Sequence, residues 1–207
     1  MVGLTRKERD RLLRQNDILQ AAERVFAIKG YHKATIQDIA KEAQYAVGTI
    51  YLYFKDKEAL YLQLIEKKLK DLSSEIKKEV NKVGGPKEKI QVLVRKQLAY
   101  FEEHQDFFKI YFLEREGLRW GARDRISKET VNKFEEYINY LTRLLKEAQD
   151  DSLIRQDIDT KRLAYVLASM LNGVIIPWLK GVCRREKITD MADFILEVFF
   201  KGVEQRP

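Results

Sequence analysis

Several residue types are scarce in this 207-residue chain, and each scarcity excludes a class of protein. The single cysteine, Cys183, rules out an internal disulfide framework. The two histidines, His32 and His104, have no metal-ligand spacing with acidic or thiol residues, so we expect no metal and no other cofactor. Cys183 has no histidine close to it in the sequence and no other catalytic set is visible, so we do not expect an enzyme.

Long apolar stretches are also missing. No run of 18 apolar residues occurs, which argues against a membrane span. The first residues, Met-Val-Gly-Leu-Thr-Arg-Lys-Glu-Arg, lack the apolar stretch of a signal peptide. At 45% hydrophobic and 34% charged residues, the chain can form a sizeable core and stay soluble. We therefore expect a cytoplasmic protein.

Proline is rare, with three residues, while Lys, Glu and Leu, which favour helices, are abundant. Apolar residues recur at helical spacing, and we find no repeat, no low-complexity segment and no strand pattern. The sequence predicts an all-α fold of nine helices. The expected helices cover residues 7–28, 36–43, a short segment from about 48, 57–80, 87–103, 107–116, 124–149, 160–182 and 190–204.

Positive charge is denser at the N-terminal end. The net charge of +7 divides into +4 over residues 1–57 and +3 over the other 150 residues. The first 14 residues carry five basic side chains against two acidic ones. This segment is either a solvated, frayed terminus or an arm that approaches phosphates or the minor groove of DNA.

Residues 35–60 predict a helix, a tight turn, a second short helix with aromatic rings and almost no charge, and the start of a third helix. Thr35 can cap the first helix, with Asp38 as the reciprocal acid of a capping box. Asp56 can cap the third, which places Lys57 at a helix N-terminus, where phosphate is favoured. This layout is that of a helix-turn-helix, whose second helix enters the DNA major groove.

The same region resembles the tetracycline-repressor (TetR) family of bacterial regulators over roughly residues 15–65. The segments that carry the similarity are Ile18–Phe26, Lys29-Gly30-Tyr31, Ile39–Ala43, Gly48–Phe54 and Lys57–Leu60. The resemblance implies two domains. Residues 1–55 would form the DNA-binding helix-turn-helix domain, and residues 56–207 the ligand-binding and dimerisation domain.

The resemblance also assigns DNA contacts. Thr35, Tyr51 and Lys57 match positions that hold phosphates. Gly48 lets the backbone come close, and Thr49 faces bases. Hydroxyl and ammonium groups suit these roles, because they bond phosphate oxygens and fix the register. The complete set of DNA-binding candidates is Thr35, Tyr45, Ala46, Val47, Gly48, Thr49, Tyr51, Tyr53, Lys55 and Lys57.

Three departures from the family pattern lie at the turn. Gln44 stands where glycine is usual, Ala46 where Ser or Thr is usual, and Val47 where many members carry Lys. Ala46 cannot cap the recognition helix or bond a phosphate. We therefore expect base readout to depend on Tyr45, Thr49 and apolar contact with thymine methyl groups.

Aromatic residues crowd the C-terminal part of the chain. Most must form an ordinary helical core, but the resemblance implies that some line a cavity for an apolar or amphipathic ligand. The ligand-binding candidates are Phe101, Phe108, Tyr111, Phe112, Trp120, Tyr137 and Trp178. Nearby Arg115, Arg119 and Arg123 could meet an anionic head group or could be solvated.

The last two predicted helices are apolar around much of their circumference, so they must be buried. In the family such helices form a four-helix dimer interface; alternatively, they complete the core of one chain. The interface candidates are Leu163, Leu167, Met170, Val174, Phe194 and Val198.

The resemblance implies a ligand-responsive repressor that binds a pseudo-palindromic operator in double-stranded DNA as a homodimer, with recognition helices about 34–36 Å apart. The effector would be a hydrophobic or amphipathic small molecule. Residues 48–61 and Trp178-Leu179-Lys180 look similar to acyl-CoA-responsive fatty-acid regulators, and a multidrug-sensing regulator of an efflux gene is the alternative. An all-helical enzyme and a helical adaptor without DNA contact remain as other classes.

Overall fold

The computed structural model describes residues 5–114, 120–182 and 187–203, and their side chains except those of residues 110–130. Within these ranges the chain forms nine α-helices and a short 3-10 helix and contains no strand, which confirms the all-α prediction. The elements are α1 (Arg6–Lys33), α2 (Ile36–Ala43), α3 (Val47–Tyr53), α4 (Lys57–Val80), α5 (Pro86–Glu103), α6 (Gln105–Glu114), α7 (Trp120–Asp150), α8 (Thr160–Leu179), η1 (Ile188–Asp190) and α9 (Met191–Val203).

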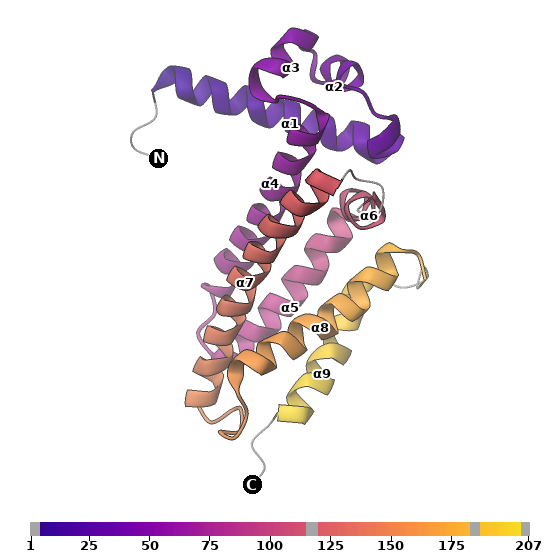
Figure 1. The fold of residues 1–207 in the computed structure, drawn as a ribbon. Helices are drawn as coiled ribbons and strands as arrows, with labels where there is room; N and C mark the ends of the chain where they lie inside the picture. The colour runs from indigo at the N-terminus through magenta and orange to yellow at the C-terminus, as the bar shows by residue number, and fades with distance from the viewer. Residues whose placement is uncertain (1–4, 115–119, 183–186, 204–207) are drawn as a thin grey trace.

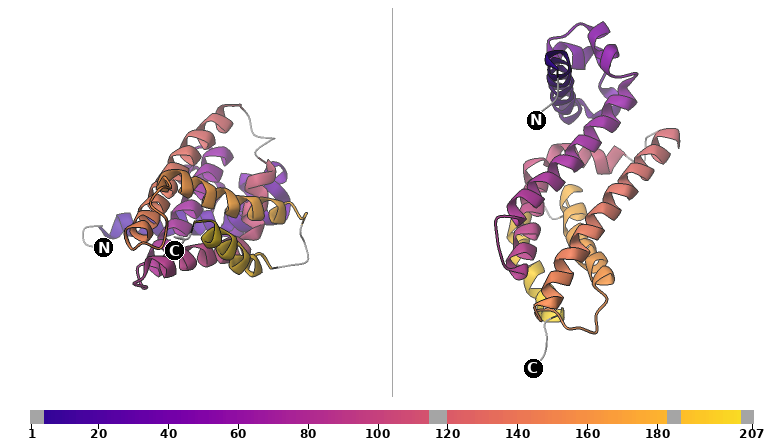
Figure 2. Two further views of the ribbon diagram at one scale, coloured as in Figure 1. Left: turned by 90° about the horizontal axis from the view of Figure 1, so that it is seen from below. Right: turned by 90° about the vertical axis from the view of Figure 1, so that its left-hand side faces the viewer.

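The helices form a small unit and a longer bundle that are joined by α4 (Figure 1). In the small unit, α2 and α3 lie on one side of α1. α4 leaves this unit and runs down the bundle, where α5 and α7 pack against it and α8 and α9 pack on α5. α6 lies against α1 at the top of the bundle, and Figure 2 shows the course of α4 from other sides.

Helix boundaries follow the prediction most closely where local caps set them. α2 and α4 match the prediction at both ends, and Asp56 caps α4 by accepting the Ala59 N–H at 2.7 Å. α1 was expected to end at Ile28, yet it continues to Lys33. Gly30 breaks the helical geometry with a φ of 72°, and one more turn follows it. The predicted end at Ile28 therefore lies close to the break at Gly30, but the turn beyond this glycine was missed.

Other ends differ from the prediction. α6 and α7 start two and four residues earlier than predicted, and Asp106 lies in the first turn of α6. α8 ends at Leu179, three residues early, where Gly181 adopts a φ of 74°. α9 starts at Met191, one residue later than predicted, and Thr189 before it lies in η1 and donates its hydroxyl to the Glu102 carboxylate at 2.9 Å.

The apolar core extends from the small unit into the bundle. Ile39, Ile50 and Phe54 are buried in the small unit. Tyr61 of α4 meets Phe26 of α1 edge-to-face, with 5.3 Å between ring centroids. Each such buried aromatic side chain contributes about 1.5–3 kcal/mol, so the first turns of α4 are fixed to the small unit.

α8 has the length and composition of a helix that could cross a membrane. This is weak evidence, because a core helix of a soluble protein passes the same test. Leu163, Leu167, Leu171 and Ile175 of α8 are buried against the bundle. Packing within the chain thus accounts for much of the apolar character of α8.

Candidate DNA-binding surface and ligand cavity

α2 is fixed at its N-terminus by a reciprocal cap. Thr35 Oγ1 accepts the Asp38 N–H at 3.1 Å, and the Asp38 carboxylate accepts the Thr35 N–H at 3.1 Å, as the capping box predicted. Lys29 donates to the same carboxylate at 2.6 Å. The bonds from Lys29 and Thr35 lower the pKa of Asp38 to about 2. Thr35 itself is exposed, and its phosphate contact stays a prediction.

The turn before α3 contains a left-handed residue. Gln44 has a φ of 58° and a ψ of 36°, a conformation that costs a non-glycine residue roughly 1–2 kcal/mol. The next residue, Tyr45, donates its hydroxyl to Asp17 of α1 at 3.1 Å. Burial, followed by this bond, raises the pKa of Tyr45. The Tyr45 hydroxyl is therefore engaged with α1, and base contact by Tyr45 stays a prediction.

α3 presents uncharged side chains to solvent. Ile50 is fully buried, whereas Tyr51 and Leu52 are 52% and 76% exposed. Gly48 is also exposed, and a Cβ built there would meet no atom within 4 Å. Packing within the chain therefore does not require glycine at this position, and the bare backbone is open to close approach by a partner.

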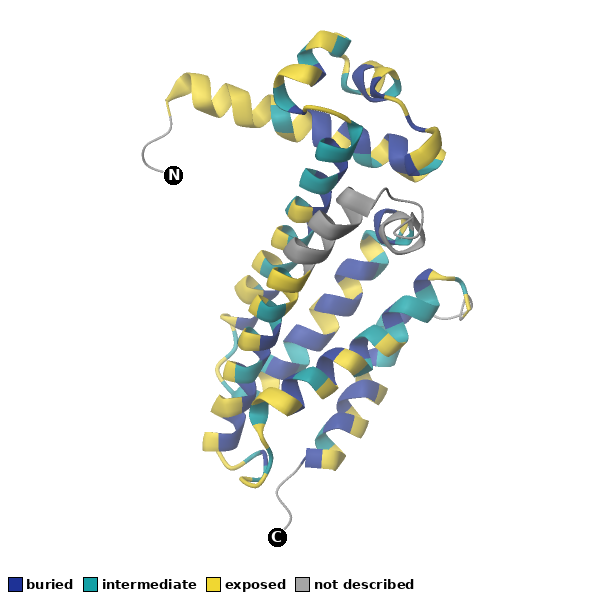
Figure 3. Cartoon of the chain, in the orientation of Figure 1, coloured by how far each residue is buried: buried dark blue, intermediate teal, exposed yellow. Residues whose placement is uncertain are grey.

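The other predicted DNA-binding residues lie on or beside the same short helix. Ala46 makes no side-chain cap bond, as predicted for its methyl group. Val47, Thr49 and Tyr53 are partly buried, and Lys55 is exposed just after α3. Figure 3 shows this helix at the end of the molecule, with exposed residues on its outer side. Of the candidates in residues 45–55, the structure thus exposes Ala46, Gly48, Tyr51 and Lys55.

Lys57 has a structural role that the sequence did not predict. Its ammonium group donates to the carbonyl oxygens of Tyr31 at 2.7 Å, Ala34 at 2.9 Å and His32 at 3.3 Å. It also lies 4.5 Å from the centroid of the Tyr31 ring. These bonds tie the start of α4 to the end of α1. A phosphate contact by Lys57 stays a prediction, and it would have to replace one of these bonds, because an ammonium group has only three N–H donors.

The basic N-terminal segment is helical from Arg6 onward. An approach of this segment to DNA stays a prediction. Thr5 and Glu8 form a capping box, with the Thr5 N–H donating to the Glu8 carboxylate at 2.8 Å. Bonds from Thr5 lower the pKa of Glu8. The first turns of α1 are exposed and project beyond the small unit (Figure 3).

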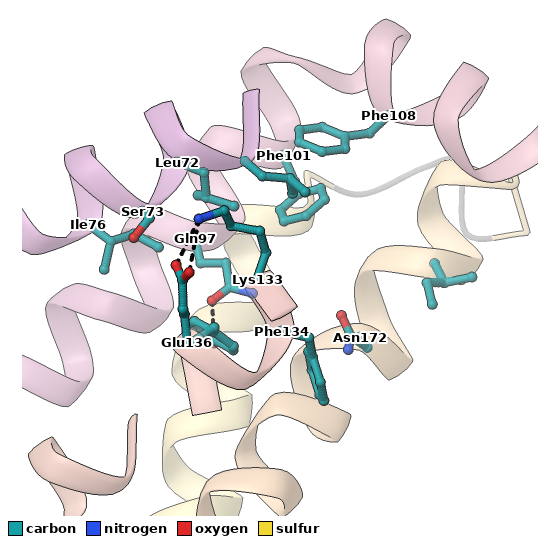
Figure 4. Close-up of a pocket in the computed structure, with 13 residues that line it drawn as sticks. Leu72, Ser73, Ile76, Gln97, Phe101, Phe108, Lys133, Phe134, Glu136 and Asn172 are labelled. Carbon is teal, nitrogen blue, oxygen red and sulfur yellow. Dashed lines mark hydrogen bonds and ion pairs between the residues drawn. The ribbon is translucent and has the colours of Figure 1, made fainter. Parts of the chain in front are cut away.

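A cavity of about 320 Å³ lies inside the bundle, between α4, α5, α6, α7 and α8 (Figure 4). Three predicted ligand-binding residues line it: Phe101, Phe108 and Tyr137. Trp178 is half-buried against the core outside this lining. The remaining candidates, Tyr111, Phe112 and Trp120, and the cationic candidates Arg115, Arg119 and Arg123, lie outside the described side chains.

The cavity is mostly apolar, with a few placed polar groups. Tyr137 donates its hydroxyl to Gln97 Oε1 at 2.5 Å, and burial raises the pKa of Tyr137. Lys133 and Glu136 form an ion pair at 2.9 Å. Their side chains are 35% and 62% exposed, which places this pair at the solvent edge of the cavity. Such a lining suits a ligand with a long apolar body.

Sequence reasoning missed more than half of the lining. The lining residues that were not predicted are Leu69, Leu72, Ser73, Ile76, Gln97, Lys133, Phe134, Glu136, Asn172 and Ile176. One signal was available: Gln97 interrupts the apolar stripe formed by Val94, Leu98 and Phe101 on α5. A polar residue on an inward helical face requires a partner, and a cavity can supply it.

A polar cluster joins the bundle to the small unit. Lys68 of α4, 8% exposed, pairs with Glu23 of α1 at 2.7 Å and lies 3.4 Å from Nδ1 of His104. Tyr100 donates its hydroxyl to the Lys68 carbonyl at 3.1 Å. Burial, and then the charge of Lys68, lower the pKa of His104.

Aromatic rings connect this cluster with the cavity. The ring centroids of Phe101 and Phe108 are 4.2 Å apart, and those of Phe108 and Phe107 are 5.2 Å apart. The Lys68 ammonium lies 5.9 Å from the Phe107 centroid. A ligand against Phe108 is therefore linked by contiguous side chains to Glu23 of α1.

The predicted dimer residues divide into three groups by burial. Leu163 and Leu167 are buried within the chain. For these two residues the alternative interpretation, a role in the core of one chain, applies. Met170 and Val174 are half-buried. Phe194 and Val198 of α9 are 60% and 46% exposed, so they are available to a partner.

The helix-turn-helix, the inward-facing cavity and the helix that links them define a ligand-responsive DNA-binding regulator. Residues 18–64 match the family described as bacterial regulatory proteins, tetR family, and residues 83–203 match the tetracyclin repressor-like C-terminal domain. The chain belongs to the TetR family of bacterial transcriptional regulators.

Several relatives are regulators of fatty acid metabolism. The fatty acid metabolism regulator protein of Bacillus subtilis is 23% identical over 189 residues, which are 91% of this chain and 95% of that protein. The structure of the fatty acid degradation regulator FadR from Bacillus halodurans is 27% identical, with a TM-score of 0.78 over 93% of this chain and 97% of its own. FadR from Bacillus subtilis in complex with stearoyl-CoA shares the fold at 23% identity, with a TM-score of 0.76 over 91% and 99% of the two chains.

Proposed function

We propose that this protein is a cytoplasmic transcriptional repressor whose homodimer binds a pseudo-palindromic operator and is released by a long-chain acyl-CoA. It acts by binding rather than by catalysis. Residues 1–55 bind the DNA, and residues 56–207 bind the ligand and form the dimer. The observation that carries this proposal is the apolar cavity inside the bundle, with polar groups at its wall and edge.

The cavity fits the apolar part of such a ligand. The side chains of Leu69, Leu72, Ile76 and Phe101 offer a hydrocarbon surface from two helices. Each buried methylene group contributes about 0.8 kcal/mol, so two more methylenes strengthen binding roughly tenfold until the cavity is filled. The structure of Bacillus subtilis FadR with stearoyl-CoA supports this class of ligand.

Lys133 is the cation that would bind the polar part of the ligand. It is the one positive side chain among the described residues that line the cavity, and it lies at the solvent edge. Its partner Glu136 neutralises it in the free protein. An acyl-CoA carries phosphates that would compete with Glu136 for this ammonium group.

Dimerisation uses the exposed apolar residues of α8 and α9. Three large apolar side chains on these helices are about half exposed: Val166, Phe194 and Val198. A two-fold partner would cover them and set the two α3 helices one DNA turn apart. Ligand binding then favours a dimer arrangement with a different spacing between the two α3 helices. It does so because the ligand binds this arrangement more tightly than the DNA-binding arrangement.

A thermal-shift experiment with the full-length protein tests the ligand class. Acyl-CoAs of 8 to 18 carbons are compared with free CoA and with cationic dyes. We expect the transition temperature to rise with chain length and to stay unchanged with CoA alone. Absence of a shift with every long-chain acyl-CoA would exclude the proposed effector.

The second candidate is a multidrug-sensing regulator of an efflux gene. One observation favours it: the Glu136 carboxylate borders the cavity and could pair with a cationic drug. In that case the dyes, and not the acyl-CoAs, would raise the transition temperature.

A further inference from the structure

The outer side of α3 is built around Leu52. A helix turns about 100° per residue, so Leu52 and Gly48 lie about 200° and 160° around the axis from the buried Ile50. Both therefore face directly away from the core, one turn apart. Leu52 is the most exposed large apolar side chain within residues 35–60, at 76%. Thr49 and Tyr51 lie on either side of the line that joins Gly48 and Leu52 along the helix.

The side chains that usually read bases are missing from this helix. α3 contains no Arg, Lys, Asn or Gln, the residues that make two hydrogen bonds to a guanine or an adenine. The hydroxyls of Thr49 and Tyr51 are its only side-chain hydrogen-bonding groups on the flanks. A leucine at the outermost position can therefore add only apolar contact.

Base edges in the major groove carry one apolar group, the C5-methyl of thymine. We propose that Leu52 reads this methyl group, with Gly48 leaving space for the groove edge, so that each operator half-site contains a thymine beneath α3. This inference rests on the DNA binding of the proposed function and adds its specificity-determining residue.

The test removes only the methyl group. A duplex is first selected from a random pool by the full-length protein, and each thymine is then replaced in turn by deoxyuridine. Binding is measured for the natural protein, for Leu52→Ala and for Leu52→Met. Because Leu52 is exposed, both variants are expected to fold, which circular dichroism checks.

We expect one thymine in each half-site at which deoxyuridine lowers the affinity about fourfold, the effect of losing one buried methyl group. Leu52→Met keeps the apolar contact, so its affinity should still fall when deoxyuridine replaces that thymine. Leu52→Ala binds the thymine and deoxyuridine duplexes almost equally, so the two changes are coupled.

Two results would overturn this inference alone: deoxyuridine that is neutral at every thymine, or a loss that is equally large in Leu52→Ala. If the protein selects no duplex at all, the DNA binding of the proposed function fails, and this inference fails with it. The outcomes are therefore distinguishable.

Discussion

Lys68 Nζ lies 2.7 Å from Glu23 Oε1, and this ion pair links the helix that runs through the ligand bundle to the first helix of the DNA-binding unit. Lys68 is nearly buried, and Glu23 keeps a quarter of its side chain exposed. Removing one partner of such a pair leaves an uncompensated charge in the junction. We therefore expect this pair to link the stability of the protein with its effector response.

We predict that Glu23→Gln lowers the free energy of unfolding by about 2 kcal/mol, because the Lys68 ammonium group loses its counter-charge. Urea denaturation measures this loss. In the double variant Glu23→Gln with Lys68→Met, much of the stability returns, since no buried charge remains. The double variant should also need more effector for release from DNA. Equal effector sensitivity in all variants would remove the pair from the coupling.

Gly48→Ala separates stability from DNA binding. Alanine is favoured over glycine in a helix by up to about 1 kcal/mol, and the position has space within the chain. We expect a higher transition temperature together with an operator affinity at least tenfold weaker, measured by fluorescence anisotropy. Affinity equal to that of the natural protein would show that DNA does not approach this backbone.

Tyr137, which lines the cavity, and Tyr140, which does not, form a matched pair on α7. Tyr137→Phe removes the donor to Gln97 and leaves a buried amide oxygen without it, so we expect a loss of about 1–2 kcal/mol in unfolding free energy. The Tyr140 hydroxyl, by contrast, has no hydrogen-bond partner among the described residues. Tyr140→Phe should therefore be neutral or slightly stabilising. A comparable loss in both variants would mean that the bond to Gln97 has no special role.

His104 predicts a dependence of stability on pH. Its pKa in the folded protein lies below the usual 6.5, through burial and the charge of Lys68. The unfolded chain then binds more protons than the folded chain at pH values between the two pKa values, so stability falls as the pH drops below about 6.5. Urea titrations at several pH values should show this fall, and His104→Asn should reduce it. If the unfolding free energy of that variant depends on pH as strongly as that of the natural protein, the effect belongs to other groups.

The features that the sequence predicted correctly are local. The cap of α2 needs only Thr35 and Asp38, and the break at Gly30 needs only that residue. The left-handed residue Gln44 stands at the position where the family usually has glycine. Such features are encoded by neighbours within a few residues, so they can be predicted without knowledge of the tertiary structure.

The features that were missed depend on distant partners. The three carbonyls around Lys57 lie 23 to 26 residues away, and Glu23 lies on another helix from Lys68. The cavity walls come from five helices, so their periodicity shows which residues face inward but not where space is left. For the same reason, burial of Leu163 within the chain could not be distinguished from burial in a dimer.

The most direct test of the account is a fluorescence anisotropy titration of the selected duplex with the full-length protein, with and without stearoyl-CoA. We predict one dimer per duplex, an affinity that falls steeply with salt because phosphate contacts release counterions, and at least tenfold weaker binding at saturating stearoyl-CoA. A duplex affinity that stays the same when the cavity is saturated with acyl-CoA would contradict the account.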